Sequence, residues 1–285
     1  MTRSPTALGV VLVLMGALTA LAASGGAARA AGVERPSFSG RGMIVYAPAR
    51  PPPAGGRALV VVLHGGLGNA ERIESARSEH GLNMDALAQK DGFVVAYLNG
   101  TPVTLRMGPD VLGWNAGGGC CGQSAANGID DVGYIRGAVA FLAGRYGVDK
   151  TRVFVMGHSN GAMMAQRLIC ETDVFAAAVA VSGPLNLNLQ TCPNARGRRV
   201  LAIHGADDQN VPIAGGQGTK GVSQAVYRSE DASRRTMEAS GASYTLKIVA
   251  GADHMLDHID AALTQAEGTT VARLAVGFFG LEDPR

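Results

Sequence analysis

A serine between two glycines is the clearest chemical signal in this chain. Ser159 lies at the centre of GHSNG, residues 157–161, directly after the apolar run 153–156. A nucleophile that projects from the edge of a sheet needs a tight turn whose neighbouring positions are small, and the serine itself takes a strained backbone conformation. A helix that follows such a turn points its free N–H groups at the same place. We therefore predict that Ser159 is the nucleophile of a covalent reaction.

A serine hydroxyl needs a general base at neutral pH, and the base needs an acid that holds its tautomer. When a serine occupies this kind of turn, the acid and then the histidine follow it along the chain. His254 and His258 both satisfy this order, and His254 is the predicted base because it lies closer to the end of the last expected strand. Asp207 and Asp208 both follow an earlier strand. We predict Asp208 as the acid and a supporting role in the loop for Asp207.

The negative charge that develops on the attacked carbonyl oxygen needs two donors that are fixed before the reaction begins. Asn160 follows the nucleophile directly, so its backbone N–H is the first predicted donor. The second is expected from the turn His64-Gly65-Gly66, which follows an expected strand. We assign the N–H of Gly66 to this role.

A cluster of acidic residues and histidines at 253–260 imitates a metal site. His254 and His258 are four residues apart, a spacing that helical metal sites use. The metalloprotease pattern requires Glu directly after the first histidine, and Met255 stands there. We expect no metal and no cofactor. The remaining histidines that end strands or flank the nucleophile are assigned structural roles: His64, His158 and His204.

The first thirty residues are typical of an export signal. Arg3 precedes an apolar, alanine-rich stretch at 7–23, and Ala28-Arg29-Ala30 is the small-x-small pattern after which signal peptidases cut. A membrane anchor is the alternative, which the short core and the cleavage pattern disfavour. We expect residues 1–30 to be a signal peptide and residues 31–285 to form a single catalytic domain, secreted or periplasmic, without a stable membrane anchor.

The cysteines and the net charge limit which kinds of site and which binding partners remain to be considered. All four cysteines lie in the exported part, and an even number in an oxidising compartment favours two disulfides, with three pairings left open. Buried thiols are the alternative, and zinc is disfavoured because an adjacent pair lacks the spacer between ligands. The net charge of +2 comes from scattered basic residues, which does not favour nucleic acid. The disulfide candidates are Cys120, Cys121, Cys170 and Cys192.

Short apolar runs alternate with amphipathic segments, which is the pattern of an α/β fold with a mostly parallel central sheet and helices on both faces. The runs are rich in Val, Ile and Leu, as in strands buried on both faces. The carboxyl ends of such strands share one edge of the sheet, where these folds place their chemistry. The expected strands are 58–63, 93–98, 152–156, 176–181, 200–204 and 244–249, and the expected helices are 82–89, 130–147, 161–170, 233–240 and 269–279.

The chain contains the stretches LVVVLHGGLGNA, GWNAGGGCCG, DDVGYIRGAVAFLAGRYGVDKTRVFVMGHSNGAMMAQRLIC, IHGADDQNVP and GADHMLDHI. In this combination they resemble the secreted esterase and polyhydroxybutyrate depolymerase family of α/β-hydrolases, which also includes feruloyl and acetylxylan esterases. The resemblance runs from about Ser37 to the C-terminus. It implies the α/β-hydrolase fold for this part of the chain.

The family pattern also implies roles for individual residues. By this resemblance Ser159 is the nucleophile, Asp208 the acid, His254 the base, and the backbone of Gly66 the second oxyanion donor. The segment that begins at Trp114 and contains the paired cysteines is expected close to the substrate cleft. Trp114, the single tryptophan, is expected to contact substrate, with packing in the core as the alternative.

The resemblance implies a secreted serine esterase that hydrolyses esters of poly- or oligo-hydroxyalkanoates through an acyl-enzyme. Feruloyl or acetylxylan esters of plant polysaccharides are the alternative substrates. Depolymerases of crystalline polymer usually carry a linker and a polymer-binding domain, which the sequence does not show, so short oligomers or soluble esters are the expected substrates. We expect a monomer. A non-catalytic binding protein is disfavoured because every candidate of the triad and both oxyanion positions are present.

Overall fold

The structure is a computed structural model that describes residues 1–2, 32–75, 82–104, 108, 110–221, 223 and 225–282. Apart from residues 1–2, the predicted export signal and its cleavage site lie outside the described residues. Within the described ranges, no helix combines the length and the apolar character that a membrane crossing requires.

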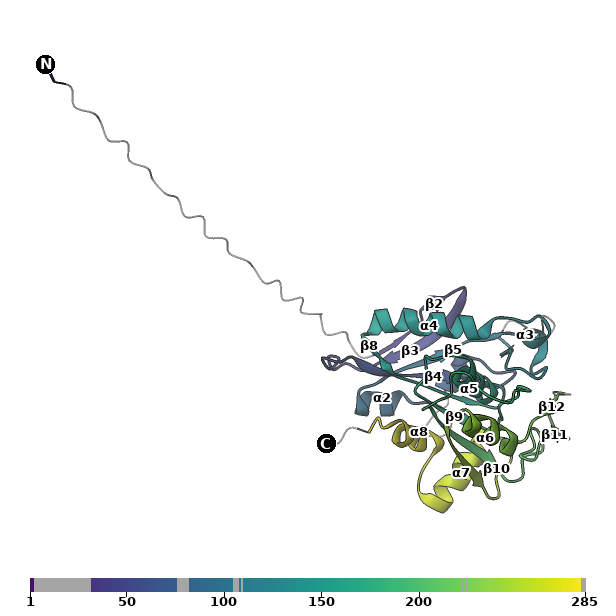
Figure 1. Ribbon diagram of the computed structural model, residues 1–285. Coiled ribbons are helices and arrows are strands. Elements are labelled where there is room, and N and C mark those ends of the chain that lie inside the picture. The colour runs from purple at the N-terminus through teal and green to yellow at the C-terminus, as the bar shows by residue number, and fades with distance from the viewer. Residues whose placement is uncertain are drawn as a thin grey trace.

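A mostly parallel sheet forms the centre of the molecule (Figure 1). Each predicted strand is confirmed, because continuous apolar runs are what strands covered on both faces require. The one large difference is that β8 begins at Val148 and continues through His158. In spatial order, the parallel strands are β5 (Val94–Leu98), β4 (Arg57–Leu63), β8 (Val148–His158), β9 (Ala177–Val181), β10 (Arg199–Gly205) and β13 (Ser243–Val249).

Antiparallel strands extend this sheet beyond β5. β3 (Arg41–Ala47) pairs with β5, and both β1 (Gly32–Glu34) and β2 (Ser37–Phe38) pair with β3. This segment was not predicted. β1 and β2 are three and two residues long and therefore too short to show a hydrophobic period. β3 is seven residues long, and the sequence analysis passed over its apolar run at 43–47. The smaller antiparallel pairs are β6 (Thr101–Pro102) with β7 (Leu112–Gly113), and β11 (Gly216–Gln217) with β12 (Val226–Tyr227).

The two faces of the sheet bury separate apolar cores. Alternate residues of β4 point to opposite faces: Leu59 and Val61 pack in one core, and Val60 and Val62 in the other. The first core contains residues of α4 (Asp131–Tyr146), α5 (Asn160–Glu171) and α6 (Glu230–Ala239), and the second contains residues of α2 (Asp85–Asp91), α7 (Leu256–Glu267) and α8 (Val271–Phe279). Figure 1 shows α4 above the strands and α2 and α8 below them.

The two ends of α4 follow the expected capping chemistry, and the structure contains further helices. Asp130 caps α4 by accepting a hydrogen bond from the N–H of Gly133 (2.8 Å), and Gly147 ends the helix with a φ of 64°. A helix was expected at His258 but was given no bounds, because its first turn is the polar cluster that imitates a metal site; it is α7. Two short helices complete the description, α1 (Ala70–Glu74) and α3 (Gly122–Ala126).

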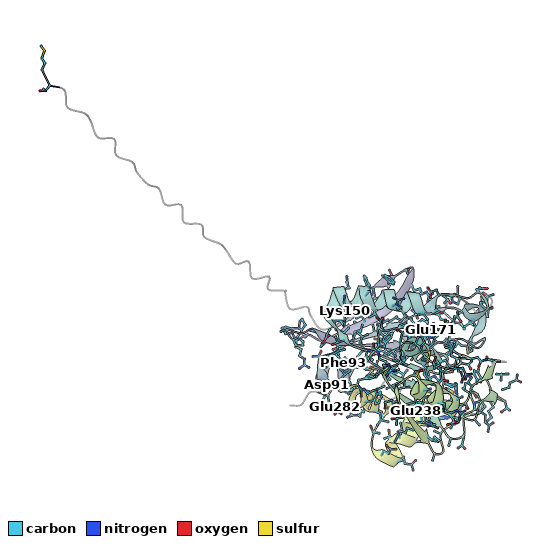
Figure 2. All side chains as sticks on the ribbon, in the orientation of Figure 1. Asp91, Phe93, Lys150, Glu171, Glu238 and Glu282 are labelled. Carbon is cyan, nitrogen blue, oxygen red and sulfur yellow. A yellow bond between two sulfur atoms is a disulfide. The ribbon has the colours of Figure 1, made fainter. Side chains whose placement is uncertain are left out.

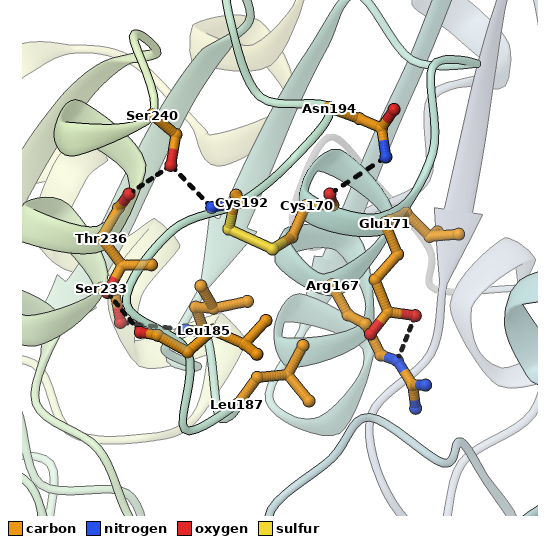
Figure 3. The surroundings of a disulfide bond; sticks show 12 residues. Arg167, Cys170, Glu171, Leu185, Leu187, Cys192, Asn194, Ser233, Thr236 and Ser240 are labelled. Atoms are coloured by element: carbon orange, nitrogen blue, oxygen red, sulfur yellow. Dashed lines mark hydrogen bonds and ion pairs between the residues drawn. A yellow bond between two sulfur atoms is a disulfide. The ribbon is translucent and has the colours of Figure 1, made fainter.

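Two disulfides resolve the pairing that the sequence left open. Cys170 at the end of α5 is bonded to Cys192 in the connection between β9 and β10 (Figure 3). Both side chains are buried, and hydrogen bonds hold their backbones, one from the N–H of Cys192 to the hydroxyl of Ser240 (2.6 Å). The second disulfide joins the adjacent residues Cys120 and Cys121.

Candidate active site

Ser159 lies in the left-handed region of backbone space, with a φ of 54° and a ψ of −118°, at the junction of β8 and α5. A residue other than glycine takes this conformation only when the surrounding structure imposes it. The N–H of Ser159 donates to the carbonyl of Val181 (2.7 Å). A Cβ atom on Gly157 would overlap the backbone of Gly161, and one on Gly161 would overlap the carbonyl of Leu63. The two glycines therefore make room for the turn.

His254 joins this serine to Asp208. Its Nε2 atom lies 2.9 Å from Ser159 Oγ, and its Nδ1 atom lies 2.7 Å from Asp208 Oδ2. The three residues come from the loops that follow β8, β10 and β13, so three parallel strands bring them to one edge of the sheet. With Nδ1–H donated to the carboxylate, Nε2 is free to accept the serine proton. This is the geometry of nucleophilic acyl transfer.

The carboxylate of Asp208 is almost fully buried and fully hydrogen-bonded. Its Oδ1 atom accepts from the backbone N–H groups of Asn210 (2.8 Å) and Val211 (2.9 Å). Burial acts to raise the pKa of this carboxyl, but hydrogen bonds from His204 and His254 outweigh it and hold the pKa well below its ordinary value. Asp208 is therefore an anion at neutral pH.

The two alternative residues lie elsewhere. The side chain of Asp207 is exposed, and its N–H donates to the carbonyl of Ala252 (3.0 Å). His258 lies in α7, is exposed, and pairs with Asp253 (2.8 Å), whose hydrogen bond raises the pKa of the imidazole. No group of three or more histidines, cysteines or acidic residues in the described ranges is placed to hold a metal ion.

The two predicted oxyanion donors lie side by side. Both line the cavity at Ser159, and a Cβ atom on Gly66 would lie 3.7 Å from Cβ of Asn160. The neighbouring N–H groups of this turn are occupied, since Leu67 donates to the carbonyl of Leu112 (2.8 Å) and Gly68 to that of Gly65 (3.1 Å). Gly66 is therefore a better placed donor than either of the residues that follow it.

The side chain of Asn160 has a function that the sequence analysis missed. Its Oδ1 atom accepts from the N–H of Trp114 (2.7 Å), and its Nδ2 group donates to the carbonyl of Trp114 (3.0 Å). The N–H of Cys121 donates to that same carbonyl (3.2 Å). This pair of bonds ties the loop that carries the adjacent disulfide to the first turn of α5.

The substrate-contacting assignment of Trp114 is wrong. Its side chain is 0% exposed, and its indole N–H donates to the carbonyl of His64 (3.0 Å). The ring packs against the His64 imidazole, with centroids 5.0 Å apart. A tryptophan buried with its one polar atom satisfied is a core residue. Through these contacts with His64, Trp114 supports the turn that contains Gly66.

Two more histidines, the buried His64 and the half-buried His158, stabilise the loops around the nucleophile. The Nε2–H of His158 donates to the backbone carbonyl of His254 (2.8 Å), which ties the loop of the base to the nucleophile turn. The Nδ1–H of His64 donates to the carbonyl of Gly65 (2.8 Å), and its Nε2 accepts from the N–H of Gly100 (3.1 Å). Burial lowers the pKa of both imidazoles to about 4. Both are neutral and structural, as predicted.

A cavity of about 860 Å³ opens beside Ser159. One wall carries the Cys120–Cys121 disulfide, together with Leu67 and Val103. The opposite wall comes from a single connection, residues 206–229 between β10 and α6. The lining residues from that connection are Asn210, Val211, Lys220, Gly221, Ser223, Ala225 and Tyr227.

A second hollow, of about 370 Å³, lies at the opposite edge of the sheet, where the parallel strands begin. Arg57 at the start of β4, Asp91, Phe93 and Glu282 line it. Figure 2 labels the last three of these close together. The described residues that line this hollow include no serine, cysteine or histidine. Ser159 and His254 both line the first cavity, so the nucleophilic chemistry belongs there.

His204 and Glu230 form a buried hydrogen-bond network behind Asp208. The sequence analysis assigned His204 only a structural role. His204 Nε2 lies 3.1 Å from Asp208 Oδ2, and His204 Nδ1 lies 2.8 Å from Glu230 Oε1. Glu230 had not been singled out, because it lies 26 residues further along the chain. The signal in the sequence was the spacing of four between His204 and Asp208 across the end of β10.

Comparison with known proteins agrees with this geometry. Residues 51–259 match the family described as phospholipase/carboxylesterase. Over 184 residues the chain is 35% identical to "Putative esterase NocK" of Nocardia uniformis subsp. tsuyamanensis, which covers 59% of this chain and 44% of that protein. The chain therefore spans less than half the length of this curated relative.

Solved structures with low sequence identity share the fold. A puromycin-hydrolysing peptidase of Mycobacterium tuberculosis matches with a TM-score of 0.60 and 17% identity over 90% of this chain and 40% of that chain. An acetyl xylan esterase of Aspergillus awamori matches with a TM-score of 0.55 and 15% identity over 88% of this chain and 99% of that chain.

The matched residues 51–259 include the nucleophile turn, Asp208 and His254. The mostly parallel sheet agrees with the α/β-hydrolase fold of the solved relatives. The chain belongs to the phospholipase/carboxylesterase family and has the α/β-hydrolase fold.

Proposed function

We propose that this protein is a secreted or periplasmic serine esterase that hydrolyses short, soluble hydroxyalkanoate esters, as polyhydroxybutyrate depolymerases do, through an acyl-enzyme. The observation that carries this proposal is the cavity at Ser159, whose surface is mainly apolar and which has one cationic residue, Lys220, in its described lining. The predicted export signal and the two disulfides support the location. The active unit is proposed to be a monomer without a membrane anchor or a nucleic-acid partner.

The reaction follows from the contacts at the site. His254 Nε2 takes the proton of the Ser159 hydroxyl while Oγ attacks the ester carbonyl. The N–H groups of Gly66 and Asn160 bind the oxyanion. His254 then gives its proton to the departing alcohol, and the acyl group stays on Oγ. Water attacks this acyl-enzyme with the same base, which releases the acid and restores the serine.

The lining favours a flexible aliphatic acyl chain. Leu67, Val103, Val211 and Met255, together with the adjacent disulfide, give the cavity apolar walls. Tyr227 is the one aromatic residue in the described lining. Sugar rings and cinnamoyl groups are usually bound against aromatic faces, whereas a hydroxybutyrate unit needs only aliphatic contact and room for its branches.

Lys220 favours an oligomeric ester of a hydroxy acid over a simple ester as the substrate. Its side chain is exposed, and the backbone N–H is anchored to the carbonyl of Gln209 (3.2 Å). An oligomer of a hydroxy acid ends in a free carboxylate, and an ammonium group at the rim can pair with it. An exposed pair of this kind contributes about 0.2–1 kcal/mol, or up to about fivefold in binding.

Acetyl esters of xylan are the second candidate. The observation that favours them is the match to the solved acetyl xylan esterase over 99% of its length. An acetyl group is small enough to enter the same cavity beside Ser159. Feruloyl esters would be cleaved by the same triad, with the feruloyl ring bound against Tyr227.

The deciding measurement is the ratio of kcat/KM for a 3-hydroxybutyrate trimer to that for methyl ferulate and for an acetylated xylo-oligosaccharide, with Ser159→Ala as the blank. A ratio well above one supports the hydroxyalkanoate esterase. A ratio well below one assigns the enzyme to plant cell-wall esters instead. Full activity in Ser159→Ala would reject the proposed nucleophile.

The carboxylate contact is tested separately with the trimer and its methyl ester. We expect a KM about threefold lower for the free acid in the wild type, and no preference in Lys220→Gln. The control is Lys150→Gln, since Lys150 is exposed on β8 (Figure 2) and does not line the cavity. Equal KM values for the two trimers in the wild type would reject the pairing.

A further inference from the structure

We propose that His204, held by Glu230, is a positioning residue: a buried imidazolium that fixes the carboxylate of Asp208 and, through it, the orientation of the His254 ring. This inference rests on the proposed function, because the proposed function assigns Asp208 and His254 to the catalytic triad. It adds a cation and a second carboxylate behind that triad.

The contacts form one chain of hydrogen bonds through the core. His204 and Glu230 are both 0% exposed. His204 Nε2 lies 3.1 Å from Asp208 Oδ2, and Nδ1 lies 2.8 Å from Glu230 Oε1. The hydroxyl of Tyr244 donates to the other oxygen of Glu230 (2.7 Å). The acid of the triad is therefore connected to a second carboxylate through one imidazole ring.

The partners of His204 define its protonation. Nε2 faces the carboxylate of Asp208 and the backbone carbonyl of Val211 (2.9 Å), which are both acceptors, so this nitrogen carries a proton. Nδ1 faces the carboxylate of Glu230, a third acceptor, so it carries a proton as well. An imidazole with a proton on each nitrogen is a cation. The geometry thus places a positive charge between two negative ones.

The titratable groups around this ring come from every element packed against it. Asp208 follows β10, the strand of His204; Glu230 begins α6; Tyr244 lies in β13, His254 follows β13, and His158 ends β8. Burial acts to lower the pKa of His204, and the hydrogen bonds to Asp208 and Glu230 outweigh it and raise the pKa to about 9. The neighbouring His158 is neutral near pH 7 because burial and the nearby imidazoles lower its pKa to about 4.

Glu230 is placed to be a stable buried anion. It is the first residue of α6, where the helix dipole favours a negative charge. Its N–H donates to the carbonyl of Ile213 (3.0 Å), and Ser229 caps the helix before it. A buried carboxylate without a cation would be very unfavourable. His204 supplies that cation on one side and Tyr244 a hydrogen bond on the other.

The consequence for the triad follows from a shared atom. Asp208 Oδ2 accepts from both His254 Nδ1 and His204 Nε2. The two hydrogen bonds fix the rotamer of Asp208. The carboxylate in turn holds Nδ1 of His254, so that Nε2 faces Ser159 Oγ. His204 thereby fixes the orientation of the general base.

The first test is direct observation of the ring. With ¹⁵N-labelled histidine, NMR of the wild type at pH 7 should show both nitrogens of His204 protonated. In Glu230→Gln, which keeps the shape and the hydrogen-bond acceptor but removes the charge, the ring should lose its second proton at least one pH unit lower. A singly protonated His204 in the wild type, or an unchanged titration in Glu230→Gln, would overturn the proposal.

The second test is the steady-state kinetics of p-nitrophenyl acetate hydrolysis. His204→Gln, which keeps one hydrogen-bond donor without the charge, should lower kcat about 10- to 100-fold and leave KM nearly unchanged, because it affects the base and not the substrate contacts. His258→Gln is the matched control and should leave both constants unchanged, since His258 pairs with Asp253 on the surface. A wild-type kcat in His204→Gln would refute the role.

These readouts separate two kinds of failure. The NMR titration does not depend on any substrate, and p-nitrophenyl acetate is hydrolysed by serine esterases of many specificities. Labelling of Ser159 by a serine-directed phosphonate shows whether each variant has kept its active site. If His204→Gln is no longer labelled, this variant has lost its active site. The NMR titration of Glu230→Gln and the wild-type spectrum then test the proposal. Persistent activity in Ser159→Ala would reject the proposed function itself.

Discussion

Asn160 holds the backbone of Trp114 with two hydrogen bonds of its side chain, one accepted (2.7 Å) and one donated (3.0 Å). The residue whose N–H is proposed to bind the oxyanion therefore also anchors the loop at one wall of the cavity. Replacement by Ala leaves the buried N–H of Trp114 unpaired, which costs about 1–3 kcal/mol. We expect Asn160→Ala to lower the free energy of unfolding by this amount.

Asn160→Ala should also lower kcat/KM, because the wall of the cavity loses its anchor while the backbone donor remains. Urea unfolding and initial rates measure the two effects. Asn127→Ala is a suitable control, since Asn127 is exposed at the end of α3. Wild-type stability in Asn160→Ala would mean that the Trp114 backbone is held by other contacts.

The nucleophile turn predicts a contrast between two glycines. A Cβ atom on Gly157 would overlap the backbone of Gly161, whereas one on Gly144, in α4, would meet nothing within 4 Å. Gly157→Ala should therefore destabilise the protein by about 2–3 kcal/mol and strongly reduce activity. Gly144→Ala should stabilise it by up to about 1 kcal/mol. Thermal unfolding of both variants is the measurement, and an equal Tm for the two would contradict the steric argument.

The buried histidines predict a maximum in stability between acidic and alkaline pH. His64 and His158 have folded-state pKa values of about 4, so below pH 6.5 the unfolded chain binds more protons and stability falls as pH decreases toward 4. His204 has a folded-state pKa of about 9, so its contribution is complete below pH 6.5 and is lost as pH rises through 9.

We therefore expect the free energy of unfolding to be greatest near pH 6.5 and to decline on both sides. Urea titrations at closely spaced pH values measure this curve. His204→Gln should flatten the alkaline side and leave the acidic side intact. A steady increase of stability from pH 6.5 to 9 in the wild type would be incompatible with a protonated His204.

The two disulfides should respond differently to removal. The Cys170–Cys192 bond closes a loop with a sequence separation of 22, for which loop entropy gives about 3 kcal/mol. The Cys120–Cys121 bond joins neighbours, so it closes no loop. Replacing Cys170 and Cys192 by Ala should mainly reduce stability. Replacing the adjacent pair by Ala should mainly change KM, because those residues line the cavity.

Both double variants are compared by urea unfolding and by steady-state kinetics with the same ester. Nearly equal stability losses would show that the adjacent disulfide contributes to the fold as well as to the cavity. An unchanged KM in the Cys120/Cys121 variant would exclude those residues from contact with the substrate.

Much of the fold and of the candidate site followed from local signals. Most of the parallel strands were predictable because they contain continuous apolar runs, whereas the edge strand β13 alternates polar and apolar residues. Ser159, Asp208 and His254 were predictable because each follows a predicted strand at the same edge. The contact between His204 and Glu230 was not, since it depends on how α6 packs against β10. The place of Trp114 depended on a loop whose conformation is set by Asn160.

The connection 206–229 supplies Asp208 at its start and then the wall of the cavity that contains Lys220 and Tyr227. Both of its ends are held in the core, at β10 and at Glu230 of α6. Part of the cavity lining therefore belongs to one exchangeable insert between two fixed anchors. Homologous segments that keep an aspartate at the position of Asp208 can be grafted there to change that part of the lining, while Ser159, His254, Gly66 and Asn160 stay in place.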